Sequence, residues 1–173
     1  MSGPWRWTLL ALAVAVCVHL AFVWATPRVL MRVAMRKLAE QAGTNVAAYP
    51  PRADEDARAI VRPSPDLLYA SCVFDLRDGP VRLAADVPDA YWSLSLYAAD
   101  TDDFFIVNDR SADAPRVELV LVRAGDAAAA PAGARVVESP SSRGVALVRT
   151  LVDRDEREPA LDAVRRSFRC GRP

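Results

Sequence analysis

The chain has 173 residues, of which 52% are hydrophobic, and its 22 basic residues are balanced by 22 acidic ones. This length and composition fit about one globular domain and exclude a long disordered or collagen-like chain. The charge balance argues against a simple electrostatic nucleic-acid binder, so we expect no nucleic-acid partner. The single histidine, His19, lies within an apolar run. The rest of the chain therefore lacks the usual base of nucleophilic catalysis and a common metal ligand.

Residues 7–25 form an uncharged run of 19 residues in which only Thr8 and His19 are polar. As a helix this run would be about 28 Å long, close to the hydrocarbon thickness of a bilayer. Tryptophans, which favour the headgroup layer, flank the run at both ends: Trp5, Trp7 and Trp24. We therefore predict a single transmembrane helix and assign residues 1–27 to a membrane anchor.

Other interpretations of this segment remain open. The small residue Ala25 would suit cleavage by signal peptidase, but the run is longer than a usual signal core and a basic helical segment follows it. Cys17 could be lipidated, but Val16 precedes it where a small residue is needed. We interpret His19 as a neutral imidazole that hydrogen-bonds the backbone or a partner helix, with a proton-handling group as the alternative.

The charges around the anchor leave its orientation open. Five basic residues and one acidic residue lie up to Gln41, whereas 17 basic and 21 acidic residues follow it. The positive-inside rule would place the part after the anchor in the cytoplasm, but the short basic amino-terminal flank is typical of an ordinary signal anchor. The basic residues that follow the run at a spacing of four can rest on anionic headgroups of either leaflet: Arg28, Arg32 and Arg36.

Residues 28–64 are predicted to form a basic stalk helix and an extended connector. Pro27 can begin a new helix or kink a continuous one, and Gly43 is a natural helix stop. The apolar residues between them recur at roughly helical spacing: Val29, Leu30, Val33 and Leu38. We expect this helix to lie at the bilayer surface and a proline-rich connector to follow, because X-Pro pairs favour extended backbone.

Beyond Pro65 the polarity alternates with a period of two, which is typical of half-buried strands. Alternate residues of the first run share one apolar face: Leu68, Ala70, Cys72, Phe74 and Leu76. Strands are predicted at 68–76, 81–87, 91–97, 104–108, 116–123, 135–138 and 144–152. About seven short strands separated by turn residues predict an all-β antiparallel sandwich over residues 65–173, with a barrel as the alternative. The alanine-rich stretch 125–134 is predicted to be a flexible loop.

A short C-terminal helix is predicted after the last strand. Asp155 can cap it, and Pro159 is tolerated only near its start. The apolar stripe that would pack on the sheet consists of Leu161, Val164 and Phe168.

Cys72 and Cys170 are a candidate disulfide. Cys72 shares the apolar face of its strand, and Cys170 follows the amphipathic tail helix. In an oxidising compartment the bond would close a loop of nearly 100 residues, which the chain-entropy model values at about 4.7 kcal/mol. In a reducing compartment the same residues would be two unrelated buried thiols.

Other chemistry has weaker support. The acidic residues Asp100, Asp102, Asp103, Asp109 and Asp113 could bind Ca²⁺, but the loop lacks the glycine and the closing glutamate of a calcium loop. We expect a solvated face, no metal and no cofactor.

No catalytic residue is predicted, although a carboxylate pair of the glycosidase type remains an alternative. A candidate ligand patch consists of Tyr91, Trp92 and Tyr97, with plain sheet packing as the alternative.

Three stretches resemble a bacterial family known as domain of unknown function 1254. They are residues 65–76 with the following turn Gly79-Pro80-Val81, residues 88–94, and the pair Ser139-Pro140 followed by residues 145–152. Leu67 stands where the family usually has a threonine, and Ser64 stands near its usual asparagine. The resemblance implies a β-sandwich, no established activity, and a short membrane-anchored branch of Gram-negative bacteria with a periplasmic soluble part. It also implies that a second sandwich, domain of unknown function 1214, follows in larger relatives.

These features predict a non-enzymatic, inner-membrane-anchored periplasmic sandwich that acts as an interaction or envelope-accessory subunit. Its expected partners are the lipid bilayer and a companion anchored chain of the domain of unknown function 1214 type. The alternative is a small-ligand-binding module or a carboxylate-based hydrolase, which requires a deep pocket at the aromatic patch. A cytoplasm-facing anchored domain is the third possibility.

Overall fold

The computed structural model describes residues 3–58, 62–126, 131 and 133–172. Within these ranges the elements follow in this order: α1 (Pro4–Ala42), β1 (Leu67–Asp75), β2 (Val81–Asp86), β3 (Trp92–Ala98), β4 (Asp103–Asn108), β5 (Arg116–Arg123), β6 (Arg135–Ser139), β7 (Arg143–Leu151), a 3₁₀ turn (Asp155–Arg157), α2 (Glu158–Arg165) and β8 (Arg169–Gly171). One long apolar helix thus precedes a β-rich part that has a short helix near its C-terminal end, as predicted, and one further short strand follows that helix. Half of the predicted flexible loop at 125–134 lies outside the described residues.

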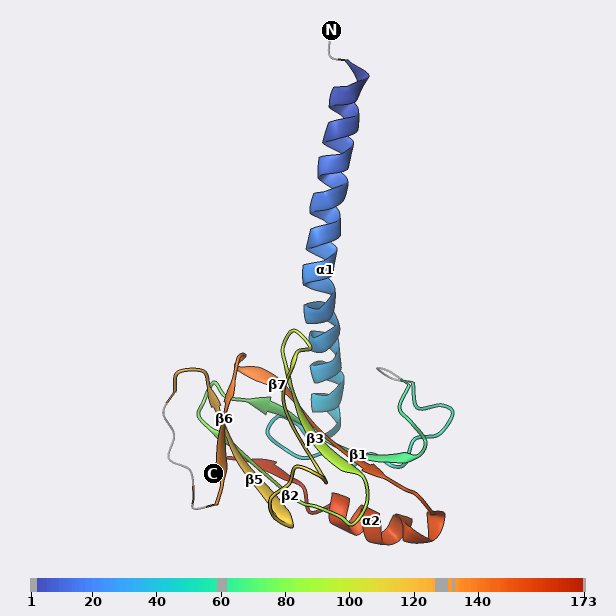
Figure 1. The fold of residues 1–173 in the computed structure, drawn as a ribbon, viewed down its shortest axis with the longest axis vertical. Coiled ribbons are helices and arrows are strands. Elements are labelled where there is room, and N and C mark those ends of the chain that lie inside the picture. Colours follow the sequence, from blue (N-terminus) through green and yellow to red (C-terminus); the bar gives the residue numbers. More distant parts are fainter. Residues whose placement is uncertain (1–2, 59–61, 127–130, 132, 173) are drawn as a thin grey trace.

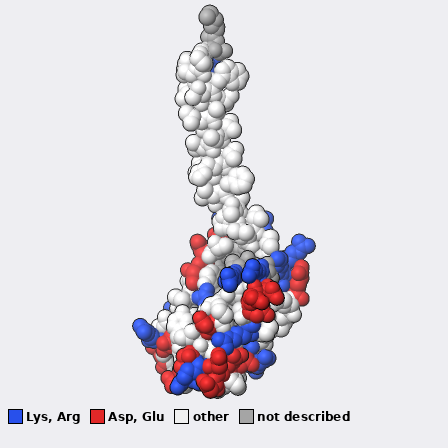
Figure 2. Space-filling view, turned by 90° about the vertical axis from the view of Figure 1, so that its right-hand side faces the viewer, with Lys and Arg blue, Asp and Glu red and all other residues white. Residues whose placement is uncertain are grey.

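α1 is a single helix of 39 residues, about 58 Å long at 1.5 Å per residue. It begins with Pro4 in its first turn and ends before Gly43, whose positive φ of 92° suits a helix stop. Pro27 lies inside it without ending it. The upper part of α1 projects away from the sheets, and its visible face is almost free of charge (Figure 1; Figure 2). The predicted anchor and stalk are therefore parts of one rod.

The lower part of α1 packs on a sheet through a stripe that differs from the predicted one. Met31 and Met35 are buried, at 7% and 5% exposure, against Val73 of β1 and Val145 of β7. Of the residues predicted to form the stripe, Leu38 joins this cluster, while three stay exposed: Val29, Leu30 and Val33. Positions 31, 35 and 38 lie on one helical face, and this face meets the sheet. The stalk is thus docked on the protein.

The strands form two four-stranded sheets (Figure 1). The first sheet has the order β1-β7-β3-β4 and is antiparallel throughout, and the second has the order β6-β5-β2-β8. The expectation of purely antiparallel pairing is wrong for β5 and β6, which pair in parallel. The count of about seven strands omitted β8, which pairs with β2 through three residues.

Both sheets contribute to one buried apolar cluster. Leu94 and Leu96 of β3 come from the first sheet, and Leu83 of β2 and Leu121 of β5 come from the second. Each of these four side chains is fully buried. The predicted inward face of the first strand supplies four further members, three from β1 and one from the residue directly after it: Ala70, Cys72, Phe74 and Leu76. Alternation with period two therefore identified the inward side of the strands.

The connector after α1 returns along the free edge of β1. Thr44 forms an isolated bridge with Val73, and Ala48 forms another with Ser71. Ala48 and Ser71 exchange both backbone hydrogen bonds, at 2.8 and 3.0 Å. This pairing covers backbone groups that an edge strand would otherwise expose.

The C-terminal helix differs slightly from its predicted form. Asp155 begins a 3₁₀ turn, and α2 follows with no side-chain cap, so the expected Asp155 cap is wrong. Pro159 lies in the first turn, where its missing N–H has no intrahelical partner to lose. Leu161 and Phe168 are buried as predicted, at 3% and 0% exposure, while Val164 is only half-buried.

Candidate functional site

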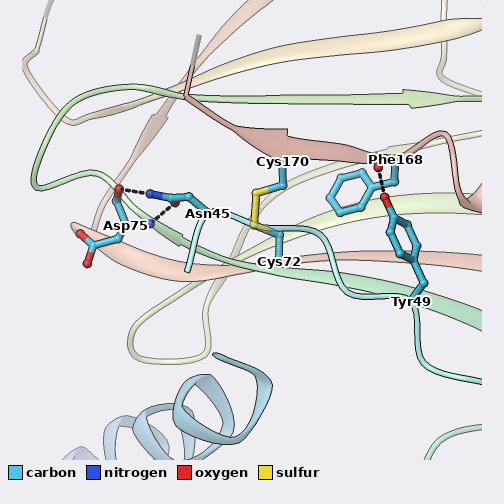
Figure 3. Close-up of a disulfide and its surroundings, with 6 residues drawn as sticks. All are labelled: Asn45, Tyr49, Cys72, Asp75, Phe168 and Cys170. Carbon is cyan, nitrogen blue, oxygen red and sulfur yellow. Dashed lines mark hydrogen bonds between the residues drawn. A yellow bond between two sulfur atoms is a disulfide. The ribbon is translucent and has the colours of Figure 1, made fainter. Parts of the chain in front are cut away.

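The disulfide joins the two sheets. Cys72 lies on β1 of the first sheet and Cys170 on β8 of the second, with their Cα atoms 6.4 Å apart (Figure 3). Cys72 is 1% exposed and belongs to the core. Beside the bond, the Tyr49 hydroxyl of the connector donates to the Phe168 carbonyl oxygen just before β8. The predicted pair is thus bonded, and the connector and the C-terminal segment meet next to it.

Asn45 fastens the connector to the end of β1. Its side-chain amide donates to the Asp75 carbonyl oxygen at 3.1 Å, and its Oδ1 accepts from the Asp75 N–H at 2.8 Å (Figure 3). Asn45 has a positive φ of 59°, a backbone region that asparagine tolerates better than most residues. Its amide therefore pairs with the β1 backbone much as another strand would.

The Asp75 carboxylate lies among arginines. Hydrogen bonds from Arg77 lower the pKa of this carboxyl below its ordinary value against the opposing effect of burial, and the charge of Arg143 adds to the lowering. Arg143 Nε lies 3.3 Å from Asp75 Oδ2. The shift therefore comes from ion pairs that stabilise the charged form, and nothing in it points to a proton donor or acceptor.

Arg165 is a buried arginine that sequence reasoning missed. It is 3% exposed, and its Nη1 donates to the carbonyl oxygens of Pro50 and Tyr69 at 2.6 and 2.8 Å. It also forms an ion pair with Asp162 on the preceding turn of α2. The position of Arg165 between Leu161 and Phe168 on the apolar stripe was the signal that could have revealed it. Its contacts make it a structural link between α2, the connector and β1.

The structure does not bring the predicted aromatic patch together. Trp92 is 1% exposed and points into the core, whereas Tyr91 is 49% exposed. Tyr97 lies on the opposite face of β3, in the cluster under α1, and its hydroxyl oxygen accepts from Arg149 Nη2 at 2.6 Å. Alternation along β3 puts Trp92 and Tyr97 on opposite faces of the sheet, and Tyr91 lies six residues before Tyr97, just outside the strand, so the three rings form no common ligand surface.

The acidic residues are also dispersed. Asp100 precedes β4 and forms an ion pair with Arg28 at 3.6 Å, whereas Asp109 follows the other end of β4. Across the described ranges, no group of three His, Cys, Asp or Glu side chains is placed to hold a metal ion. Asp100 and Asp109 therefore lie at opposite ends of β4, and the five carboxylates do not share one loop.

The residues predicted at a membrane interface lie on the exposed part of α1. Trp5, Trp7 and Trp24 are 65%, 66% and 63% exposed. The Arg28 guanidinium lies 4.4 Å from the centre of the Trp24 ring and donates to the Trp24 carbonyl oxygen at 2.7 Å. By its length and composition α1 could span a membrane, and it is the one helix of the described part that could do so.

The two edges of the first sheet differ. The connector covers β1, but β4 pairs only with β3 within the described part of the chain. We call residues 104–107, the apolar part of β4, the β4 edge. Ile106 is 55% exposed, and its neighbours Phe105 and Val107 are only partly buried. A partly exposed apolar edge strand is a surface on which another protein can pack.

The family model of a protein of unknown function, DUF1254, matches residues 44–172. The chain belongs to this family. Its fold is similar to the crystal structure of the VPA0106 protein from Vibrio parahaemolyticus, with a TM-score of 0.62 and 15% identity over 84% of this chain. An uncharacterized protein from Burkholderia cenocepacia gives a TM-score of 0.46 at 17% identity, over 62% of this chain and 31% of that one. No curated protein matches the chain.

The DUF1254 match confirms the predicted family and extends beyond the motifs that suggested it. It begins two residues after α1 ends and includes the connector, both sheets and α2. The chain spans 36% of the length of the Vibrio protein. This DUF1254 chain therefore corresponds in fold to about a third of that solved relative.

Proposed function

We propose that this DUF1254 protein is a membrane-anchored β-sandwich that acts as a non-enzymatic interaction subunit at the bilayer surface. The observation that carries the proposal is the division of α1 into an exposed apolar part and a part packed on the first sheet. Because both parts belong to one helix, the sheets would be held against the membrane. The core shared by the two sheets and the disulfide between them support the two-layer sandwich.

The proposed location of the sheets is the periplasm of a Gram-negative bacterium. The disulfide supports this side, because structural disulfides persist in oxidising compartments. The basic residues after the apolar run favour the cytoplasm on the positive-inside rule, but two of them have carboxylate partners. Arg28 pairs with Asp100, and Arg36 lies 3.6 Å from Glu40. Because the rule counts Lys and Arg and is not a net-charge rule, these pairs leave that signal unchanged, and the proposed periplasmic location rests on the disulfide.

The proposed partner is a companion anchored chain with a sandwich of the domain of unknown function 1214 type. The uncovered β4 edge offers it an apolar contact, and the fold match covers only 36% of the solved Vibrio protein. The dispersed aromatic rings and carboxylates favour a binding role over catalysis. The partner would meet the β4 edge while its own helix lies beside α1.

Site-specific photocrosslinking tests this contact. We expect a benzophenone amino acid at Ile106, on the β4 edge, to form an adduct with a second anchored sandwich chain in intact cells. The control is the same probe at Ala160, which is exposed on α2. Equal adducts from both positions, or adducts with lipid alone at Ile106, would contradict the proposed partner.

Extraction tests the anchoring by itself. The intact chain should stay in the membrane pellet after alkaline carbonate and dissolve only in detergent, because residues 7–25 bury apolar surface in lipid. Release by carbonate would show that the chain does not span the membrane.

A further inference from the structure

The junction between α1 and the first sheet lies at the depth of lipid headgroups. This step rests on the proposed function, because it takes residues 7–25 as the membrane span. Arg32 follows Ala25 by seven residues, or about 10 Å along the helix, and the headgroup layer is roughly 5–8 Å thick on each side. Since a long arginine side chain can bend back toward the membrane surface, its guanidinium can reach phosphate groups there.

Two grooves meet at Arg32. One, of about 270 Å³, lies between α1 and the loops after β3 and β6, and includes Arg28 and Ser141. The other, of about 440 Å³, lies between α1 and the start of β7, and includes Arg36 and Arg143. The loop between β3 and β4 rises beside α1 (Figure 1). The walls of these grooves therefore bring arginines from α1 and β7 to the membrane-facing end of the sheet.

The charge in these grooves is only partly balanced. Arg28 pairs with Asp100, Arg36 with Glu40, and Arg143 with Asp75. Arg32 stands between these pairs, and the structure gives it no hydrogen bond or ion pair with any described residue. Its side chain is exposed and is shared by both grooves. A guanidinium in this position has all its donors available for an anionic ligand.

We infer that Arg32 binds the phosphate group of an anionic phospholipid in these grooves, with Arg36 as the second contact. Arginine suits this ligand because its planar fork donates two parallel hydrogen bonds to phosphate oxygens. The bound lipid would neutralise the unpaired cation and add a polar contact between the sheet and the bilayer. A free phosphate ion has the same chemistry, so the test must separate the two sources.

Native mass spectrometry of the full chain in a neutral detergent provides the test. Dioleoylphosphatidylglycerol should bind more tightly than dioleoylphosphatidylcholine, and Arg32→Gln should weaken its binding roughly tenfold. Arg36→Gln should weaken it by a smaller factor, because Glu40 already engages this residue. The control is Arg110→Gln, which removes an equal charge just beyond the far end of β4. Intact mass should show that the disulfide is retained in every variant.

The outcomes separate the lipid from the ion. If added inorganic phosphate displaces the lipid from the wild-type chain but not from Arg32→Gln, the result would support the phosphate site and assign it to the soluble ion. Lipid binding that phosphate does not displace would support the lipid. Equal binding by Arg32→Gln and Arg110→Gln, or no preference for the anionic lipid, would overturn the inference. The carbonate extraction decides the anchoring separately, so a chain that stays anchored with unchanged lipid binding would contradict only this inference.

Discussion

Cys72 and Cys170 are separated by 98 residues in sequence, and their bond constrains the unfolded chain more than a short loop would. We predict that Cys170→Ala lowers the free energy of unfolding by about 2–5 kcal/mol, measured by denaturant titration in mild detergent. The control is Cys17→Ala, because Cys17 is a free thiol exposed on α1. The same stability for Cys170→Ala and the wild type would show that the bond adds nothing.

Asp75 makes the stability depend on pH. Hydrogen bonds from Arg77 lower its pKa in the folded chain, so its contribution is present above the unfolded pKa of about 3.9. This contribution is lost as the pH falls through the lower folded pKa. We predict that Asp75→Asn is less stable than the wild type by about 1–2 kcal/mol at pH 7 and that the difference shrinks in acid. A constant difference from pH 7 to pH 2 would contradict this origin.

Gly144 is required by close packing in the first sheet. A Cβ atom there would overlap the Tyr97 carbonyl oxygen and the Phe74 ring. Because a backbone atom cannot move aside cheaply, Gly144→Ala should lower the thermal midpoint and cost about 3 kcal/mol or more. Gly171→Ala is the matched control, since its nearest neighbour would be the Asn45 carbonyl oxygen at 3.9 Å. Equal losses in the two variants would mean that packing at Gly144 is not the cause.

At the scale of elements, the contact between α1 and the first sheet depends on two methionines. We predict that Met35→Ala lowers the free energy of unfolding by about 2 kcal/mol, because it leaves a cavity against Val73 and Val145. Val33→Ala, on the exposed side of the same helix, should change it by less than about 0.5 kcal/mol. Chemical denaturation in the same detergent compares them. A larger effect at Val33 would indicate that the stripe predicted from sequence makes the contact with the sheet.

The bounds of a helix or strand could be predicted wherever a local sequence pattern alone determines them. The strands from β1 to β7 begin and end within about two residues of their predicted bounds, because turn residues punctuate an alternating sequence. β8 was missed because three residues are too few for a period to show. The stripe of α1 was mispredicted because lipid and sheet both select apolar residues, so Val33 and Met35 look alike in sequence.

The candidate sites depended on contacts between distant segments. The pairing of Cys72 with Cys170 was accessible because few cysteines exist and one lies on an inward face. Arg165 was missed because its partners, the carbonyl oxygens of Pro50 and Tyr69, lie about 100 residues away in sequence. The aromatic patch failed for a local reason, since Trp92 and Tyr97 lie five residues apart on one strand and so face opposite sides.

At the scale of the whole molecule, one long helix, α1, precedes two sheets that are joined by a disulfide. The C-terminal part of α1, from Met31 onward, is packed on the first sheet, and the disulfide ties this sheet to the second. With α1 as the proposed membrane anchor, the docked sheets would lie at a defined distance from the bilayer. This arrangement would suit the proposed role of a subunit that meets its partner beside the bilayer, and the proposal requires that the sheets lie on the oxidising side.

A pair of C-terminal fusions in a Gram-negative host tests most directly whether the sheets lie in the periplasm. Alkaline phosphatase needs an oxidising compartment for its own disulfides, whereas a standard green fluorescent protein exported through the general secretory route does not fluoresce. We predict an active phosphatase fusion and a dark fluorescent fusion, with Cys72 and Cys170 bonded in the intact chain. A fluorescent fusion with inactive phosphatase would place the sheets in the cytoplasm and contradict the account.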